Sequence, residues 1–198
     1  GNVLKGNIYG KAQLLVKAED SGSVKKTVNV HCIQKATWLC FLEESLEFSE
    51  VSTVSIMVLL DENATVQQLK WQSADESIAT ISDDGQLTLT GKAGTTTITA
   101  STIDGSNLSQ SMKITFRKLV QSLTFDNSNY YMTVGEKKQA NIQIIPQDAT
   151  NRTLSYYSSN PNVASVENGI ITAKAEGTAA ITVTTTDGTS LSTSTFVT

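Results

Sequence analysis

The chain has 198 residues, of which 39% are hydrophobic and 17% charged, and its formal net charge is −4. This apolar share is large enough for packed cores, which excludes a wholly disordered chain. Adjacent cations occur as isolated pairs such as Lys25-Lys26 and Lys137-Lys138, so no basic tract is available for nucleic acid. The longest apolar run, Ile56 to Leu60, is far shorter than the roughly 20 residues that cross a bilayer. We expect neither a nucleic-acid partner nor a transmembrane segment.

An internal repeat organises the chain. Similar segments begin at Gly10, Gly94 and Gly177, so that consecutive copies start 84 and 83 residues apart. A fixed period of this kind indicates tandem copies of one structural unit. We therefore divide the chain into repeat 1 (residues 1–36), repeat 2 (37–118) and repeat 3 (119–198). Repeat 1 is a partial copy, because it lacks the counterpart of residues 37–84.

Within each repeat the apolar residues alternate with polar ones, which is typical of strands that bury one face. Ala12, Leu14 and Val16 form such a row in repeat 1, and equivalent rows begin at Thr96 and Ala179. The dipeptides Asp104-Gly105 and Asp187-Gly188 follow these rows and predict hairpin turns into the next strand. Each complete repeat is therefore predicted to be a β-sandwich of two antiparallel sheets, without helices.

Several segments resemble the bacterial immunoglobulin-like group 2 domain family. They are WQSADESIATISDDGQLT and GKAGTTTITASTIDGS in repeat 2, and YYMTVGEKKQANIQIIPQDAT and SSNPNVASVENGIITAKAEGTAAITVTTTDGTS in repeat 3. The resemblance implies an all-β fold of tandem immunoglobulin-like β-sandwiches, with two full copies and a C-terminal half copy at the N-terminus. In that family the domains occur as arrays in bacterial surface proteins, including intimin- and invasin-like adhesins, or as spacers beside other modules. The family brings no shared catalytic residues.

The expected function is accordingly non-catalytic. We expect an extracellular or cell-surface bacterial protein that acts in adhesion or as a spacer, with a host or surface protein or a glycan as partner. An accessory region of a surface carbohydrate-active enzyme, or a glycan-binding protein, stays open as the alternative. Residues 1–20 lack the basic start and apolar core of a secretory signal, so an export signal would have to lie outside these residues.

We expect no catalytic, metal or cofactor site. The only histidine, His31, falls on the predicted solvent side of a strand. The segment from Gly85 to Gly91-Lys92 has five residues between its glycines and Ala93 after the lysine, which does not fit a phosphate-binding loop. Asp83-Asp84-Gly85 could offer oxygen ligands to calcium, but a hairpin turn explains the same residues without a metal.

Two cysteines flank the junction between repeats 1 and 2. Alignment of the repeats places Cys32 at the position of Phe116 and Cys40 at that of Phe125, both inward-facing. They are either two small buried side chains or a disulfide that clamps the junction, and the sequence leaves both open. The same alignment predicts that Trp38 and Trp71 lie in the core.

One strand of repeat 2 is predicted to have an apolar outer face. With an offset of 85 residues between the repeats, Met57 and Leu59 point into the core. The outward row is then Val54, Ile56 and Val58 in repeat 2, where repeat 3 has Gln139, Asn141 and Gln143. Three outward aliphatic side chains usually mark a contact, which residues 1–36, a second chain or an external partner could provide. A shift of one residue in the alignment would exchange the two rows.

Repeat 1 is too short to form a sandwich by itself. Its strands have one apolar face with nothing to cover it. We expect residues 1–36 to dock on repeat 2, to pair with another chain, or to be poorly ordered.

Overall fold

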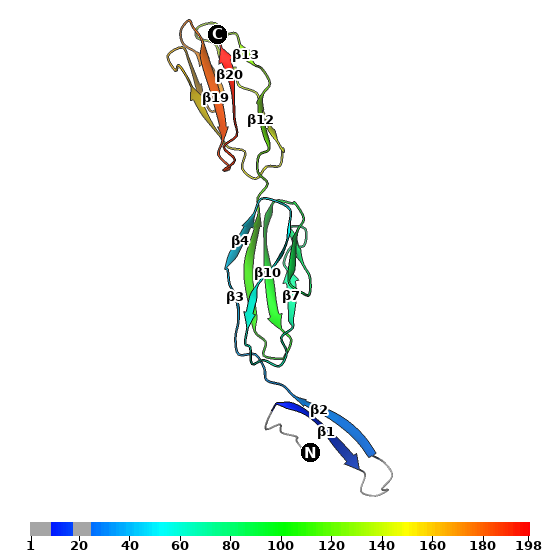
Figure 1. Ribbon diagram of the computed structural model, residues 1–198. Coiled ribbons are helices and arrows are strands. Elements are labelled where there is room, and N and C mark those ends of the chain that lie inside the picture. Colours follow the sequence, from blue (N-terminus) through cyan, green and yellow to red (C-terminus); the bar gives the residue numbers. More distant parts are fainter. Residues whose placement is uncertain (1–8, 18–24) are drawn as a thin grey trace. The chain divides into compact units, whose positions relative to one another are not determined.

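The computed structural model describes residues 9–17 and 25–198, except for the side chains of residues 15–17 and 25. These residues form strands, turns and loops, and no helix occurs among them. The predicted all-β fold of tandem immunoglobulin-like sandwiches is thereby confirmed (Figure 1).

The described part of repeat 1 is a hairpin. It consists of β1 (Gly10–Lys17) and β2 (Lys25–Cys32), which pair in antiparallel register with Ala12 opposite Val30 and Leu14 opposite Val28. Neither strand pairs with any other described strand. Residues 1–8, the loop 18–24 and the Val16 side chain of the predicted row lie outside the described residues. The docking of residues 1–36 stays a prediction.

Repeat 2 forms three sheets. One has the order β4 (Ser45–Phe48), β11 (Ser109–Phe116), β10 (Gly94–Thr102) and β7 (Leu69–Ser73). A second has the order β5 (Thr53–Ser55), β9 (Gln86–Leu89) and β8 (Ala79–Ile81), and a third pairs β3 (Leu39–Phe41) with β6 (Val58–Leu60). Leu87, Ile98 and Ile114 are completely buried, one from each of three strands. The alternation predicted for β10 is therefore confirmed.

Repeat 3 has the same arrangement of strands. Its four-stranded sheet has the order β13 (Asn129–Tyr130), β20 (Ser192–Val197), β19 (Ala179–Thr185) and β16 (Leu154–Ser158). The other two sheets are β14 (Lys137–Gln139), β18 (Ile170–Ala173) and β17 (Ala164–Glu167), and the pair β12 (Ser122–Phe125) and β15 (Ile142–Ile145). Its core includes Ile171, Ile181 and Val183, all completely buried.

Two compact units are distinguished by the contacts between Cα atoms. The first contains the described residues up to Leu46, together with Ser52–Leu89 and Thr96–Ile114, and the second contains Glu47–Val51, Thr90–Thr95 and Thr115–Thr198. The division into residues 1–36, 37–118 and 119–198 rests on the sequence repeat and stays a prediction.

The predicted outward row of repeat 2 is wrong. Ile56 is buried, with 8% of its surface exposed, and Val54 and Val58 are half-buried, whereas Met57 and Leu59 are 67% and 44% exposed. The inward row is therefore Val54, Ile56 and Val58.

The cause of the error is one extra residue in repeat 3, at the end of β15. Leu39 pairs with Leu60 in β3–β6, and Leu123 pairs with Ile144 in β12–β15, so the offset here is 84 rather than 85. In the loop that follows, Ala64 N donates to Asp61 O and Ala149 N donates to Pro146 O. Asp61 comes directly after Leu60, whereas Ile145 stands between Ile144 and Pro146. This extra residue changes the offset and exchanges the two faces of the strand.

The same shift corrects the predictions for Cys40 and Trp38. Cys40 is exposed and Trp38 is 45% exposed, because the inward positions beside them are held by Leu39 and Phe41. Cys32 is half-buried, and both cysteines are free thiols, so the structure contains no Cys32–Cys40 disulfide. Trp71 is half-buried and packs edge-on against Phe41 with 6.1 Å between ring centroids. His31 is exposed, as predicted.

Candidate functional site

In the described part of the chain, the acidic turn residues and His31 are not gathered into one site. No three His, Cys, Asp or Glu side chains of these residues are placed to hold a metal ion. Asp83 and Asp84 lie in a tight turn in which Gly85 N donates to Ser82 O at 3.0 Å. Gly85 has a φ of +78°, and a Cβ there would lie 3.1 Å from the Trp71 ring. Backbone conformation and close packing thus account for the glycine of this turn.

Residues 34–36, the linker that precedes repeat 2, are held to that repeat by hydrogen bonds, of which the first two are reciprocal. Gln34 N donates to Thr65 Oγ1 at 2.8 Å, and Thr65 N donates to Gln34 O at 2.9 Å. The threonine therefore binds both backbone polar groups of one linker residue. Such a pair fixes the position of the linker more closely than a single bond would.

The Asp104-Gly105 turn holds the next two residues of the linker. Ala36 N donates to Asp104 Oδ2 at 2.5 Å, and Lys35 Nζ donates to Gly105 O at 2.7 Å. Hydrogen bonds from the Ser106 side chain and from the N–H groups of Ala36 and Ser106 hold the pKa of Asp104 down at about 2. The carboxylate is therefore charged at neutral pH, and it accepts the linker N–H as a charge-assisted bond.

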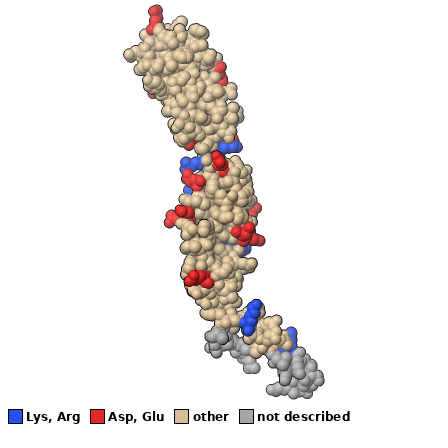
Figure 2. Space-filling view, viewed as in Figure 1, with Lys and Arg blue, Asp and Glu red and all other residues tan. Residues whose placement is uncertain are grey.

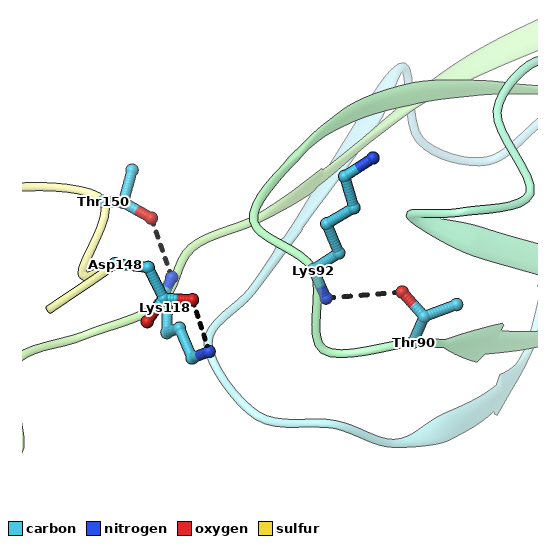
Figure 3. A network of polar contacts seen from close by, with 5 residues as sticks. All are labelled: Thr90, Lys92, Lys118, Asp148 and Thr150. Atoms are coloured by element: carbon cyan, nitrogen blue, oxygen red, sulfur yellow. Dashed lines mark hydrogen bonds and ion pairs between the residues drawn. The ribbon is translucent and has the colours of Figure 1, made fainter. Parts of the chain in front are cut away.

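Repeat 3 holds its own linker through equivalent atoms. Lys118 N donates to Thr150 Oγ1, and Thr150 N donates to Lys118 O, both at 2.8 Å. Val120 N donates to Asp187 Oδ2 at 2.7 Å. The Lys118 side chain also forms a 2.8 Å ion pair with Asp148, which Figure 3 shows beside the Thr150 bond. Burial pushes the pKa of Asp187 upward, but hydrogen bonds from the Thr189 side chain and Val120 N–H outweigh it and the pKa is lowered.

We call each of these arrangements a linker clamp. In repeat 2 it consists of Thr65 and Asp104 acting on Gln34 and Ala36, and in repeat 3 of Thr150 and Asp187 acting on Lys118 and Val120. The Asp-Gly dipeptides predict only the turns, so this second role of the aspartates was not predicted. A signal was present, because both threonines and both aspartates stand at equivalent positions of the repeat.

A second candidate site is the outward face of the β3–β6 sheet. Cys40 and Leu59 lie directly opposite each other on this face. The side chains that the face presents are Trp38, Cys40, Leu42, Met57 and Leu59, and all five are exposed. We call this set the β3–β6 apolar face. It replaces the predicted set Val54, Ile56 and Val58 as the outward apolar row of repeat 2.

Acidic residues follow both strands of this sheet. Glu43 and Glu44 come directly after Leu42, and Asp61 and Glu62 come directly after β6. Asp61 is buried, and hydrogen bonds from the Thr37 side chain and from Asn63 lower the pKa of its carboxyl. Leu42 and Met57 line a common surface depression together with Glu43. The apolar face therefore has carboxylates at its two ends.

Figure 2 shows Asp and Glu side chains scattered over a surface that is mostly uncharged. Within the described ranges, no helix has the length and apolar character that crossing a membrane requires.

Comparison with known families gives a match in the C-terminal repeat. Residues 119–196 match the model of the bacterial Ig-like domain (group 2). The chain is 32% identical over 134 residues to an Ig-like virion protein of Serratia phage KSP90, which covers 66% of this chain and 52% of that protein. It is also 32% identical over 150 residues to an uncharacterized protein of Clostridium acetobutylicum, covering 75% of this chain but 15% of that protein. The chain thus spans about half or less of these relatives.

Solved structures with the same fold include two arrays of immunoglobulin domains. Sidekick-1 immunoglobulin domains 1–4 match with a TM-score of 0.52 and 14% identity, over 98% of this chain and 59% of that one. The four N-terminal Ig domains of a Dscam1 isoform match with a TM-score of 0.51 and 13% identity, over 94% of this chain and 53% of that one. At this level of identity the likeness shows the fold alone.

Proposed function

We propose that this chain, in which residues 119–196 match the bacterial Ig-like domain (group 2), is a non-catalytic segment of an extracellular or cell-surface protein and acts as a spacer. Its units would be the tandem domains 37–118 and 119–198. Residues 1–36 would supply the last two strands of a further domain of the same kind.

The observation that carries the proposal is the repeated linker clamp. A spacer requires that each domain begin at a defined point of its own surface. In repeats 2 and 3 the same backbone groups are bound by a threonine and by the aspartate of an Asp-Gly turn. An enzyme or a small-molecule binding protein has no need to repeat a contact of this kind, whereas an array of equal units does.

The relatives support the same role. One is named as an Ig-like virion protein, which is a component of an assembled particle, and 32% identity over most of this chain supports a structural role here. Adhesion is the second candidate, because the β3–β6 apolar face offers a surface for a partner. Glycan binding has less support. Adjacent exposed aromatic rings would favour it, but of the neighbouring tyrosines Tyr130 and Tyr131 the first is 6% exposed and belongs to the core, while the second is 74% exposed.

Stretching single molecules of the whole chain tests the proposal. Two separate unfolding events are expected, each releasing about 80 residues, or roughly 290 Å of extended chain. One event that releases both repeats together would contradict independent spacer units. Events much shorter than 80 residues would place the domain boundaries elsewhere.

A further inference from the structure

The β3–β6 apolar face is not a requirement of the fold. At the equivalent positions repeat 3 is polar: Thr124 stands for Cys40, Asp126 for Leu42, Asn141 for Met57 and Gln143 for Leu59. These four polar residues are also exposed. The same two-stranded sheet therefore forms with a polar outward face in repeat 3 and an apolar one in repeat 2. Packing within repeat 2 does not account for the apolar side chains on that face. The exposed side chains are neighbours rather than scattered single residues, and neighbouring exposed apolar side chains are a mark of contact surfaces.

The free edge of β3 indicates what shape of partner fits. Asp61 N donates to Trp38 O at 3.2 Å, so the alternation of an antiparallel pair directs the backbone groups of Leu39 and Phe41 away from β6. Among the described strands none pairs with β3 on that side. Native edge strands are usually protected by charged side chains, and repeat 3 has Asp126 where repeat 2 has Leu42. An added strand would bond to this edge and extend the apolar face.

The charges at the two ends indicate the chemistry of the partner. Glu43 and Glu44 stand at the Leu42 end, and Glu62 stands at the Trp38 end, all three exposed. Two copies of this chain stacked through the face would bring acidic ends together in either direction, which is unfavourable. A segment with cations at both ends would instead place each cation near carboxylates of the face. The attraction between these exposed charges is strongest at low salt, because salt screens it.

We infer that the β3–β6 apolar face binds an extended segment of a partner protein, apolar along one side and flanked by Lys or Arg at both ends. The segment pairs with the free edge of β3 and places its apolar side chains beside Trp38, Cys40 and Leu42. Its terminal cations lie near Glu43, Glu44 and Glu62. This inference adds a partner to the extracellular role proposed above, and its test is independent of the stretching experiment.

A random peptide library displayed on phage is the probe. It is selected on the whole chain after depletion on a variant that carries the repeat 3 residues, C40T/L42D/M57N/L59Q. The enriched peptides should alternate apolar residues between terminal Lys or Arg, bind the wild type at least 10-fold more tightly than the variant, and weaken as salt increases. A second variant, E43Q/E44Q/E62Q, should keep the apolar preference but lose the salt dependence.

Three results would overturn the inference. One is the absence of peptides that prefer the wild type to the four-residue variant, and another is enrichment of peptides without basic ends. The third is sedimentation of the wild type as a dimer that the variant abolishes, since the occupant would then be a second copy. Leu59→Gln alone serves as the milder variant if the four substitutions unfold repeat 2. Equal unfolding midpoints of wild type and variant exclude a loss of binding through misfolding.

Discussion

The carboxylate of Asp104 accepts a 2.5 Å hydrogen bond from the backbone N–H of Ala36, which precedes it by 68 residues. The bond joins the linker to the turn that follows the C-terminal end of β10. Asp187 makes the equivalent bond with Val120 in repeat 3. Both tryptophans of the chain, Trp38 and Trp71, lie in repeat 2, so their fluorescence reports on this repeat alone, whereas circular dichroism reports on both.

The first prediction concerns the clamp aspartate. Asp104→Ala should lower the Tm of repeat 2, measured by tryptophan fluorescence, by several degrees, because the carboxylate no longer accepts hydrogen bonds from the N–H groups of Ala36 and Ser106. Asp83→Ala removes the same charge from an exposed position of another turn and should leave the Tm within error. An equal decrease for both variants would mean that charge, rather than the clamp, matters.

The clamp should also give repeat 2 a defined acid sensitivity. The pKa of Asp104 is about 2 in the folded chain against 3.8 for the free side chain, so its stabilising contribution is complete above about pH 4. The contribution is lost as the pH falls from 4 through 2. The difference in Tm between wild type and Asp104→Asn should therefore be constant from pH 7 to 5 and shrink between pH 4 and 2. A difference that persists unchanged at pH 2 contradicts the assigned pKa.

The threonine half of the clamp is tested in repeat 3. Thr150→Val keeps the shape of the side chain but removes the oxygen that accepts the Lys118 N–H bond. It should lower the free energy of unfolding of repeat 3 by about 0.5–1.5 kcal/mol, measured by circular dichroism in urea. Thr150→Ser retains the hydroxyl and should lose less. If serine and valine are equally destabilising, the hydrogen bond is not the cause.

Core substitutions test whether the two repeats unfold independently. Ile98 and Ile181 occupy equivalent positions and are both completely buried. Each Ile→Ala change should destabilise its own repeat by about 2–5 kcal/mol. Ile98→Ala should shift the fluorescence transition, and Ile181→Ala should shift only a circular dichroism transition. A shift of the tryptophan signal by Ile181→Ala would show that the repeats unfold together.

The cysteines should differ in reactivity. Cys40 is exposed in the β3–β6 apolar face, whereas Cys32 is half-buried. Native protein without reductant should therefore contain two thiols that react with a thiol reagent, one faster than the other. Cys40→Thr should remove the fast phase of the reaction. A peptide map with Cys32 bonded to Cys40 would restore the disulfide that the structure does not contain.

The sequence by itself determined the class of fold, the repeat and the long strands. Rows such as Met112, Ile114 and Phe116 alternate over many residues, and the turn at Asp104-Gly105 is encoded by its own two residues. These features depend on local periodicity and on local backbone preference, so neighbouring residues are sufficient to predict them.

Only the tertiary structure decided which face of β6 is outward and which atoms bind each linker. The side chains of a strand alternate with a period of two residues, so one extra residue at Ile145 was enough to exchange inward Ile56 with outward Met57 in the alignment. The clamp joins Ala36 to Asp104 across 68 residues, and the turn signal at Asp104 contains no information about that distant partner. Register and long-range polar contacts depend on how strands pair in space, because a local pattern is compatible with more than one pairing.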